Sequence, residues 1–242
     1  MIILGICGQK SSGKDSFADI AKKILQSDKV MKLSFAKPLK DFVINLFNLQ
    51  SKYAWGSEAD KNYPIATWGK YFTQDALDKY KKENDTLLST REILQVVGTD
   101  VMRLGNFNFL VEDLRSKVKS FIMKHFNKEV AHDTIWIDLL KKDIEDLNAR
   151  GIADIFIISD VRFANEVNSV KSWGGKVVRL YRDTNLTNSI PHPSELEMNN
   201  ILDKEFDYVL YEEDNVNLKQ LRKFVLRVLM EEKLVNSIGY SI

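Results

Sequence analysis

The chain has 242 residues, of which 44% are hydrophobic and 29% are charged, with a formal net charge of +1. This composition suits one domain with a sizeable core, and gives no support to nucleic acid or an anionic membrane as the main partner. The single cysteine, Cys7, excludes an intramolecular disulfide, and no apolar stretch approaches the length of a membrane span. With no secretory pattern at the start, we expect a cytoplasmic protein.

The first predicted element is a buried strand that leads into a glycine-rich turn. An apolar run at residues 2–7 is followed by Gly-Gln-Lys-Ser-Ser-Gly-Lys-Asp-Ser at residues 8–16. Such a loop wraps backbone N–H groups around nucleotide phosphates, and its lysine reaches the β and γ phosphates. The apolar residues of 17–25 fall on one helical face, which supplies the helix that the motif requires. The alternative is an ordinary strand, flexible turn and helix.

Four further apolar runs predict buried parallel strands, at residues 30–35, 155–159, 177–181 and 206–211. Helical periodicity lies between and after them, at residues 135–147, 163–173 and 218–229. This alternation predicts a three-layer α/β/α fold with a five-stranded parallel sheet, in which ligands bind at the carboxyl ends of the strands.

Residues 38–148 are too long for one crossover and predict a large, mostly helical insertion. Within it, a helix beginning at Thr90 buries apolar residues and places Arg91, Gln95 and Thr99 on a polar stripe. Residues 71–88 read as a solvated helix and loop, to which we assign no function.

Charged side chains follow the predicted strands where each strand ends. Lys37 follows the second strand, Asp160 and Arg162 follow the third, and Arg182 ends the fourth. Glu166 lies four residues after Arg162 and is expected on the same helix face. Phosphoryl transfer needs cations of this kind, because the protein mainly positions two phosphates and stabilises their charge.

Each of these residues also has a plain structural interpretation. Asp160 could cap a helix, and Glu166 could simply pair with Arg162. Arg179, which lies in the fourth predicted strand, could be solvated. Arg91 could be a surface residue, although a cation in a first helical turn is unfavourable against the helix dipole, which favours an anionic partner.

Four blocks, taken in order, resemble the phage-type deoxynucleoside monophosphate kinases, which are P-loop kinases of the adenylate-kinase-like group. They are residues 8–16 with an aspartate after the lysine, residues 35–40, residues 90–100 and residues 160–166. The resemblance runs from residue 1 to about residue 211. It implies one kinase domain over 1–242, with a core at 1–37 and 149–242, a monophosphate-binding insertion at 38–148 and a lid at 183–200.

The resemblance also implies roles for individual residues. The set expected to hold ATP and its Mg²⁺ is Lys10, Ser12, Gly13, Lys14, Asp15 and Ser16. The set expected to bind the acceptor is Ala36, Lys37, Arg91, Gln95, Thr99, Trp136, Asp160 and Glu166, with Trp136 packing on the base. The set expected to carry the transfer is Lys14, Asp15, Asp160, Arg162 and Arg182.

Asp15 stands where this loop usually has a serine or threonine that ligates Mg²⁺. A carboxylate is also a hard magnesium ligand, so Asp15, helped by Ser16, is expected to hold the metal. Asp160 could instead be the metal ligand, and the sequence does not separate the two.

The predicted reaction is Mg²⁺-assisted transfer of the γ-phosphoryl group of ATP to a deoxynucleoside monophosphate. The alternatives are a kinase for another phosphorylated small molecule, such as phosphomevalonate, and a nucleotide-binding switch protein. The partner is a small nucleotide, with neither nucleic acid nor membrane. A homodimer and the base preference are left open by the sequence, and the resemblance implies a phage protein in a host cytoplasm.

Overall fold

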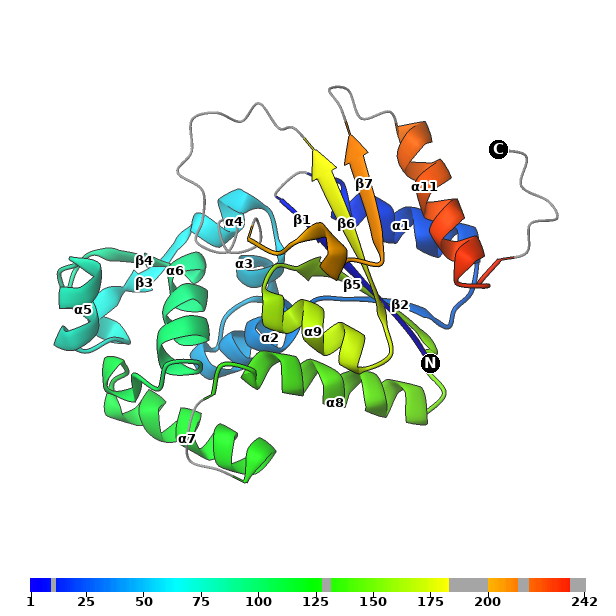
Figure 1. Cartoon of the computed structure of the whole chain (residues 1–242). Helices are drawn as coiled ribbons and strands as arrows, with labels where there is room; N and C mark the ends of the chain where they lie inside the picture. Colours follow the sequence, from blue (N-terminus) through cyan, green and yellow to red (C-terminus); the bar gives the residue numbers. More distant parts are fainter. Residues whose placement is uncertain (10–11, 128–131, 183–199, 213–217, 236–242) are drawn as a thin grey trace. The chain divides into compact units, whose positions relative to one another are not determined.

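The computed structural model describes residues 1–9, 12–127, 132–182, 200–212 and 218–235 (Figure 1). It divides into two compact units. The sheet unit comprises Met1–Phe35 and Leu140–Ile242, and the helical unit comprises Ala36–Leu139. That these units are the core and the insertion of one kinase domain stays a prediction.

The sheet unit contains a five-stranded sheet in the order β2-β5-β1-β6-β7, and every neighbouring pair is parallel. The strands are β1 (Ile2–Gly8), β2 (Val30–Leu33), β5 (Ile155–Val161), β6 (Lys176–Arg182) and β7 (Tyr208–Glu212). The predicted α/β fold and its five parallel strands are therefore confirmed. Strand β1 is the central strand, with β5 and β2 on one side of it and β6 and β7 on the other. In sheets of this kind, ligands usually bind at the carboxyl ends of the strands where the connections leave toward opposite sides, which is where the loop after β1 lies.

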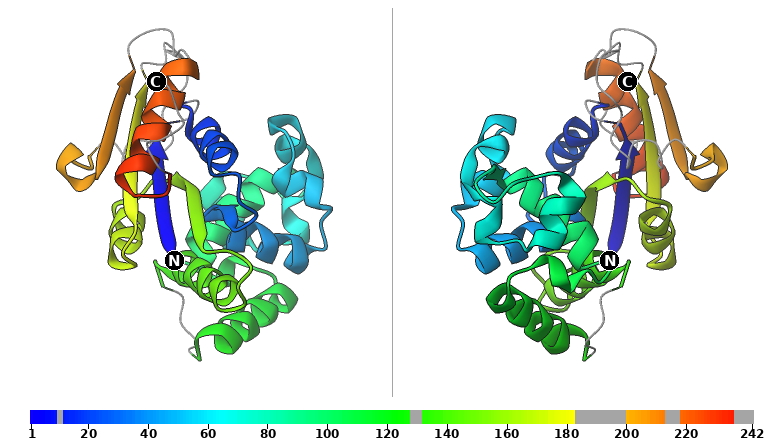
Figure 2. Two further views of the ribbon diagram at one scale, coloured as in Figure 1. Left: turned by 90° about the vertical axis from the view of Figure 1, so that its right-hand side faces the viewer. Right: turned by 90° about the vertical axis from the view of Figure 1, so that its left-hand side faces the viewer.

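Helices cover both faces of this sheet (Figures 1 and 2). Helices α1 (Lys14–Leu25) and α11 (Leu218–Glu231) pack side by side over Leu4 and Ile6 of β1. Helix α9 (Ala164–Ser172) covers the other face and comes so close to β1 that a Cβ on Gly5 would lie 3.3 Å from Val170. Because successive side chains of a strand point to opposite faces of the sheet, successive residues of β1 lie against different helices.

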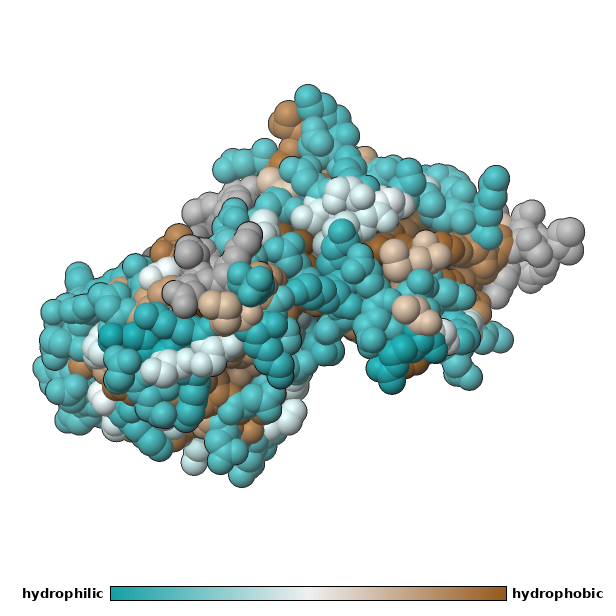
Figure 3. Space-filling view, turned by 90° about the horizontal axis from the view of Figure 1, so that it is seen from below, coloured by the Kyte–Doolittle hydropathy of each residue, from teal (hydrophilic) through white to brown (hydrophobic). Residues whose placement is uncertain are grey.

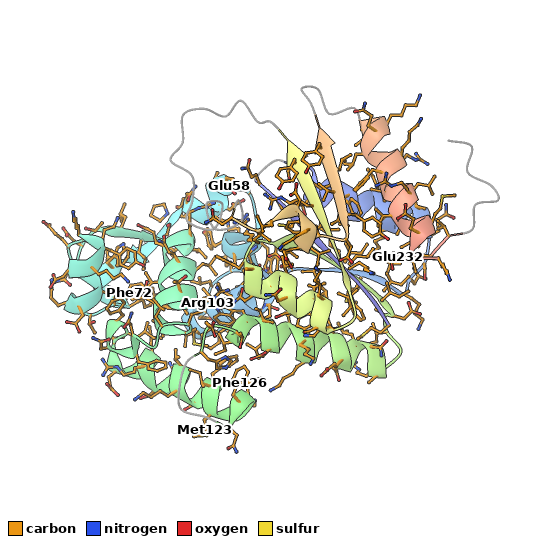
Figure 4. All side chains as sticks on the ribbon, viewed as in Figure 1. Glu58, Phe72, Arg103, Met123, Phe126 and Glu232 are labelled. Atoms are coloured by element: carbon orange, nitrogen blue, oxygen red, sulfur yellow. The ribbon has the colours of Figure 1, made fainter. Side chains whose placement is uncertain are left out.

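The helical unit is built from short helices and one small sheet. Its helices are α2 (Ala36–Phe47), α3 (Ser51–Trp55), α4 (Glu58–Asn62), α5 (Gln74–Tyr80), α6 (Thr90–Gln95) and α7 (Glu112–Phe126), and α8 (Ile135–Ala149) begins here and continues into the sheet unit. Strands β3 (Pro64–Thr67) and β4 (Leu87–Ser89) pair antiparallel. Its core gathers around fully buried residues such as Trp68, Leu88 and Val118, with Phe72, labelled in Figure 4, packed among them.

The interpretation of residues 71–88 as a solvated helix and loop is wrong in part. Helix α5 lies there, but Ala76 and Leu77 on it are fully buried, and Leu88 enters the core from β4. Most of the lysines and acidic residues of this stretch are exposed, but Lys79 pairs with the buried Asp100. A three-residue strand has too little sequence to show a period, so its pairing with β3 depends on contacts made across the unit.

The surface in Figure 3 is mainly hydrophilic, with hydrophobic residues scattered over it. Among the described segments, none of the helices combines the length and the apolar composition that spanning a bilayer requires.

Candidate functional site

The turn after β1 has a geometry that only glycine permits at two positions. A Cβ on Gly8 would lie 2.3 Å from Oγ of Ser12 and 2.8 Å from the carbonyl oxygen of Leu180. Gly13 has φ of 88°, in the left-handed region, and immediately precedes α1. The backbone N–H of Ser12 closes the turn by donating to the Gln9 carbonyl at 3.2 Å. Lys10 lies outside the described residues.

The hydroxyl group of Ser12 is buried and unsatisfied among the described residues. Its side chain is buried, and Oγ has no hydrogen-bond partner among the described residues. Leaving a buried hydroxyl unsatisfied costs about 1–3 kcal/mol, so such atoms usually mark a site for water or a ligand. Its place in the glycine turn fits a phosphate oxygen.

Lys14, the first residue of α1, points back into the same turn. Its Nζ donates to the carbonyl oxygens of Gly8 at 2.6 Å and Gln9 at 2.5 Å. Burial, together with the positive charge of Arg162, lowers the pKa of Lys14 to about 8. Two neutral carbonyls are weak compensation for a buried cation, whereas a phosphate would both bond to it and neutralise it.

Asp15 and Ser16 bring hard oxygen donors to the first turn of α1. The carboxylate of Asp15 is 80% exposed and forms an ion pair at 2.8 Å with Lys32 of β2. A solvent-accessible carboxylate with a neighbouring hydroxyl fits Mg²⁺, which keeps several waters and takes one or two protein ligands beside substrate phosphates.

The end of β5 carries Asp160 and Arg162. Oδ1 of Asp160 accepts the backbone N–H of Phe35 at 2.7 Å, which ties the segment after β2 to the tip of β5. The side chain of Arg162 is exposed, and its charge contributes to the lowered pKa of Lys14. These residues therefore lie in the same electrostatic neighbourhood as the glycine turn.

Glu166 does not share a helix face with Arg162, so that expectation is wrong. Helix α9 begins at Ala164, after Arg162, and the buried carboxylate of Glu166 accepts the backbone N–H groups of Arg162 at 2.8 Å and Phe163 at 3.2 Å. This is the capping arrangement of an acidic residue in the first turn. It fixes the backbone from which the Arg162 side chain extends.

Arg179 is the residue here that the sequence interpretation missed. It lies on β6 beside Cys7, is 1% exposed, and donates from Nη1 to the Cys7 sulfur at 3.1 Å. Its guanidinium stacks on Tyr181 and Phe206 at 4.5 and 5.5 Å from the ring centres. Burial raises the pKa of the Cys7 thiol, and Arg179 opposes that rise. A central parallel strand is buried on both faces, a signal that argued against a solvated arginine.

In the helical unit, α6 and the turn after it expose the predicted polar stripe. Arg91, Gln95 and Thr99 are all exposed, while Ile93 and Val97 are buried. Ala36 and Lys37 open α2, where Lys37 pairs with Asp41 at 2.8 Å. The contacts of Arg91 within this unit are with α4, through Glu58 and Asn62.

Trp136 is a core residue in this structure. It is 2% exposed, and its indole N–H donates to the carbonyl oxygen of Gly98 at 3.0 Å. A base could stack only on an accessible ring face, so its burial gives no support to the predicted packing on the acceptor. Gly98 is tightly placed as well, because a Cβ there would lie 2.6 Å from Leu39.

Arg182 belongs to β6 by its backbone, but its side chain lies outside the described part of the structure. The predicted lid at 183–200 falls almost wholly outside the described residues. The assignment of site residues as a whole stays a prediction.

Comparisons with known proteins found two viral relatives that match most of the chain. No protein-family model matches the chain. It is 27% identical over 229 residues to a protein of Acanthamoeba polyphaga mimivirus named "Putative deoxynucleotide monophosphate kinase", covering 95% of both chains. It is 22% identical over 224 residues to the deoxynucleotide monophosphate kinase of Enterobacteria phage T4, covering 77% of this chain and 86% of that protein. Among solved structures, dephospho-CoA kinase from Campylobacter jejuni matches with a TM-score of 0.44 at 12% identity, covering 95% of this chain and 96% of that one.

Proposed function

We propose that this chain, a homologue of the viral deoxynucleotide monophosphate kinases, transfers the γ-phosphoryl group of ATP to the phosphate of a deoxynucleoside monophosphate. The products are ADP and the deoxynucleoside diphosphate. The observation that carries this proposal is the glycine turn after β1, in which Lys14 and Ser12 are buried with incomplete compensation for their polar groups.

The donor side consists of residues in the sheet unit. Lys14 would leave the carbonyls of Gly8 and Gln9 for the β and γ phosphates of ATP, and Ser12 would donate its unpartnered hydroxyl to a phosphate oxygen. Asp15 and Ser16 would hold Mg²⁺, which neutralises phosphate charge when it is bound. Gly13 would complete the turn around the phosphates, and Lys10 is proposed to bind them as well.

The acceptor side draws on exposed cations and polar groups. Arg91, Gln95 and Thr99 would bind the monophosphate, with Lys37 near its phosphate, and Asp160 would orient it. Arg162 and Arg182 would stabilise the charge that spreads over the transferring group. A phosphate acceptor is already ionised at neutral pH, so no general base is required.

The direct test measures ADP release from ATP and Mg²⁺ in the presence of single monophosphates. We expect release that depends on a deoxynucleoside monophosphate, that stops when Mg²⁺ is chelated, and that falls about 10²–10³-fold in Lys14→Ala. Lys23→Ala is the matched control, because Lys23 is an exposed lysine on the same helix.

Two results would contradict the proposal. Stimulation by phosphomevalonate but by no nucleotide would assign a different phosphorylated acceptor. ADP release that no phosphorylated acceptor increases would indicate a nucleotide-hydrolysing switch.

A further inference from the structure

Arg91 is held on one edge of its guanidinium by two residues of α4. Its Nε donates to Oδ1 of Asn62 at 2.9 Å, and its Nη2 donates to Oε2 of Glu58. Glu58 and Asn62 are the first and last residues of α4, one helical turn apart, so they lie on the same face. Figure 4 labels Glu58 on this helix. All three residues belong to the helical unit.

A second edge of the guanidinium, formed by Nη1 and Nη2, has no partner among the described residues. An arginine binds a phosphate best through two parallel N–H groups, and it has more than one edge that can do so. Glu58 and Asn62 occupy the edge formed by Nε and Nη2. Both N–H groups of Nη1 and one of Nη2 have no partner among the described residues. The Arg91 side chain as a whole is 49% exposed, so it is accessible to a ligand.

Helix α4 has only five residues, yet local contacts fix it in place. The hydroxyl of Ser57 and the carboxylate of Asp60 form a capping box, in which Asp60 accepts the Ser57 N–H at 2.8 Å. The ring of Tyr53, in the middle of α3, stacks on that of Tyr63, which follows α4, with centres 5.7 Å apart and planes 16° from parallel. A helix this short is not stable alone, so these contacts make it a rigid support.

The ion pair between Glu58 and Arg91 also compensates for an unfavourable charge at the start of α6. Arg91 is the second residue of that helix, where the helix dipole disfavours a cation. The Glu58 carboxylate offsets that cost, and the hydrogen bond that it accepts from Arg91 comes from Nη2. An exposed ion pair contributes little to stability by itself, so orientation is the more important consequence of the contact.

We propose that Glu58 and Asn62 are positioning residues, which hold Arg91 with its second edge presented to the phosphate of the monophosphate acceptor. This inference rests on the proposed function, in which Arg91 binds that phosphate. An arginine that is ordered before the ligand arrives loses less side-chain entropy on binding, which tightens the complex.

The experiment is steady-state kinetics of Glu58→Ala and Asn62→Ala with the monophosphate that the wild type uses best. Each change should raise the KM for the monophosphate about two- to tenfold, the effect of ordering one long side chain. The KM for ATP and kcat at saturating acceptor should stay unchanged. Glu58→Gln keeps an oxygen acceptor for Nη2 and should restore a large part of the loss.

Lys61→Ala is the matched control. Lys61 lies on the same helix, 3.8 Å from Oε1 of Glu58, and its removal leaves both contacts to Arg91 intact. The KM for the monophosphate should not change. In an Arg91→Ala background, adding Glu58→Ala should have no further effect, because a positioning residue acts only through the side chain that it orients.

The outcomes separate the inference from the function on which it rests. A lower KM in Glu58→Ala would show that the carboxylate competes with the phosphate, and would overturn the inference. So would an unchanged KM in both α4 variants when Arg91→Ala itself raises it, or a Glu58 effect that persists in Arg91→Ala. An absence of acceptor-dependent ADP release in the wild type would instead overturn the proposed function.

Discussion

The protonation of Lys14 depends both on its burial and on whether a phosphate is bound to it. Its ammonium group is buried against backbone carbonyls, and its pKa falls to about 8, mainly because burial disfavours the charged form. A bound phosphate favours the charged form, so ATP binding and protonation of Lys14 support one another. The residue is therefore poised to respond to both ligand and pH.

We expect kcat/KM for ATP to fall as the pH rises through about 8. Above that pH the free enzyme loses the Lys14 proton, and the decline should approach about tenfold per pH unit. Stability should change in the opposite direction. Between pH 8 and the ordinary lysine pKa, the unfolded chain binds more protons than the folded one, so the free energy of unfolding rises.

Initial rates between pH 6.5 and 9.5 at limiting ATP test this prediction. A parallel series at limiting monophosphate and saturating ATP is the control, because bound ATP keeps Lys14 protonated. A kcat/KM for ATP that stays level to pH 9.5 would contradict it.

At the scale of elements, α6 presents the acceptor-side residues through two local devices. A capping box fixes its start, with Glu92 Oε2 accepting the Ser89 N–H at 2.9 Å and Ser89 Oγ accepting the Glu92 N–H at 3.4 Å. A π-helical turn at Val96–Val101 follows, in which Met102 donates to the carbonyl of Val97 at 3.0 Å. Wider turns of this type occur often at functional sites, and this one begins directly after Gln95 and contains Thr99.

Ser89→Ala removes the hydroxyl that caps α6 and should lower the free energy of unfolding by about 1 kcal/mol. For a chain of this length, that loss corresponds to a fall of about 2–4 °C in Tm. Urea unfolding with far-ultraviolet circular dichroism measures the effect. Ser116→Ala, within α7, is the control and should change stability by less than about 0.5 kcal/mol. Equal effects of the two changes would contradict a capping role for Ser89.

At the scale of the whole molecule, the proposed ligands fall mainly on different units. The residues proposed for ATP lie in the sheet unit, and most of those proposed for the monophosphate lie in the helical unit. Each unit has its own hydrophobic core, the first around Leu4 and Phe17 and the second around Trp68 and Ile93. We therefore expect ATP to stabilise mainly the sheet unit, and the monophosphate to stabilise mainly the helical unit.

Hydrogen exchange followed by mass spectrometry should show this separation. A non-hydrolysable ATP analogue alone should slow exchange in the glycine turn and α1, because ligand binding suppresses local opening. The monophosphate alone should slow exchange in α2 and α6. Helix α7, which carries none of the proposed ligand residues, should be unaffected by either. Protection of α1 by the monophosphate alone, without any effect on α6, would contradict the proposed division.

The sequence predicted the elements of the sheet unit well, because their signals are local. The apolar runs ended within a few residues of the strands seen, and Phe17, Ala21 and Ile24 are buried on α1 as their spacing indicates. It predicted less of the helical unit, where β3 and β4 are too short to show a period. Side-chain partners were the least predictable, as Glu166 shows by capping a backbone instead of pairing across a helix face.

By itself the sequence determined the strand, glycine turn and helix around Lys14, the parallel sheet and the exposed stripe from Arg91 to Thr99. Spacing along the chain fixes which residues share a face and which conformations glycine alone permits. Only the tertiary structure decided that Arg179 is buried beside Cys7, and that Arg91 meets Glu58 and Asn62, which lie 33 and 29 residues away in the chain. Such contacts depend on how distant segments pack, and no local pattern records them.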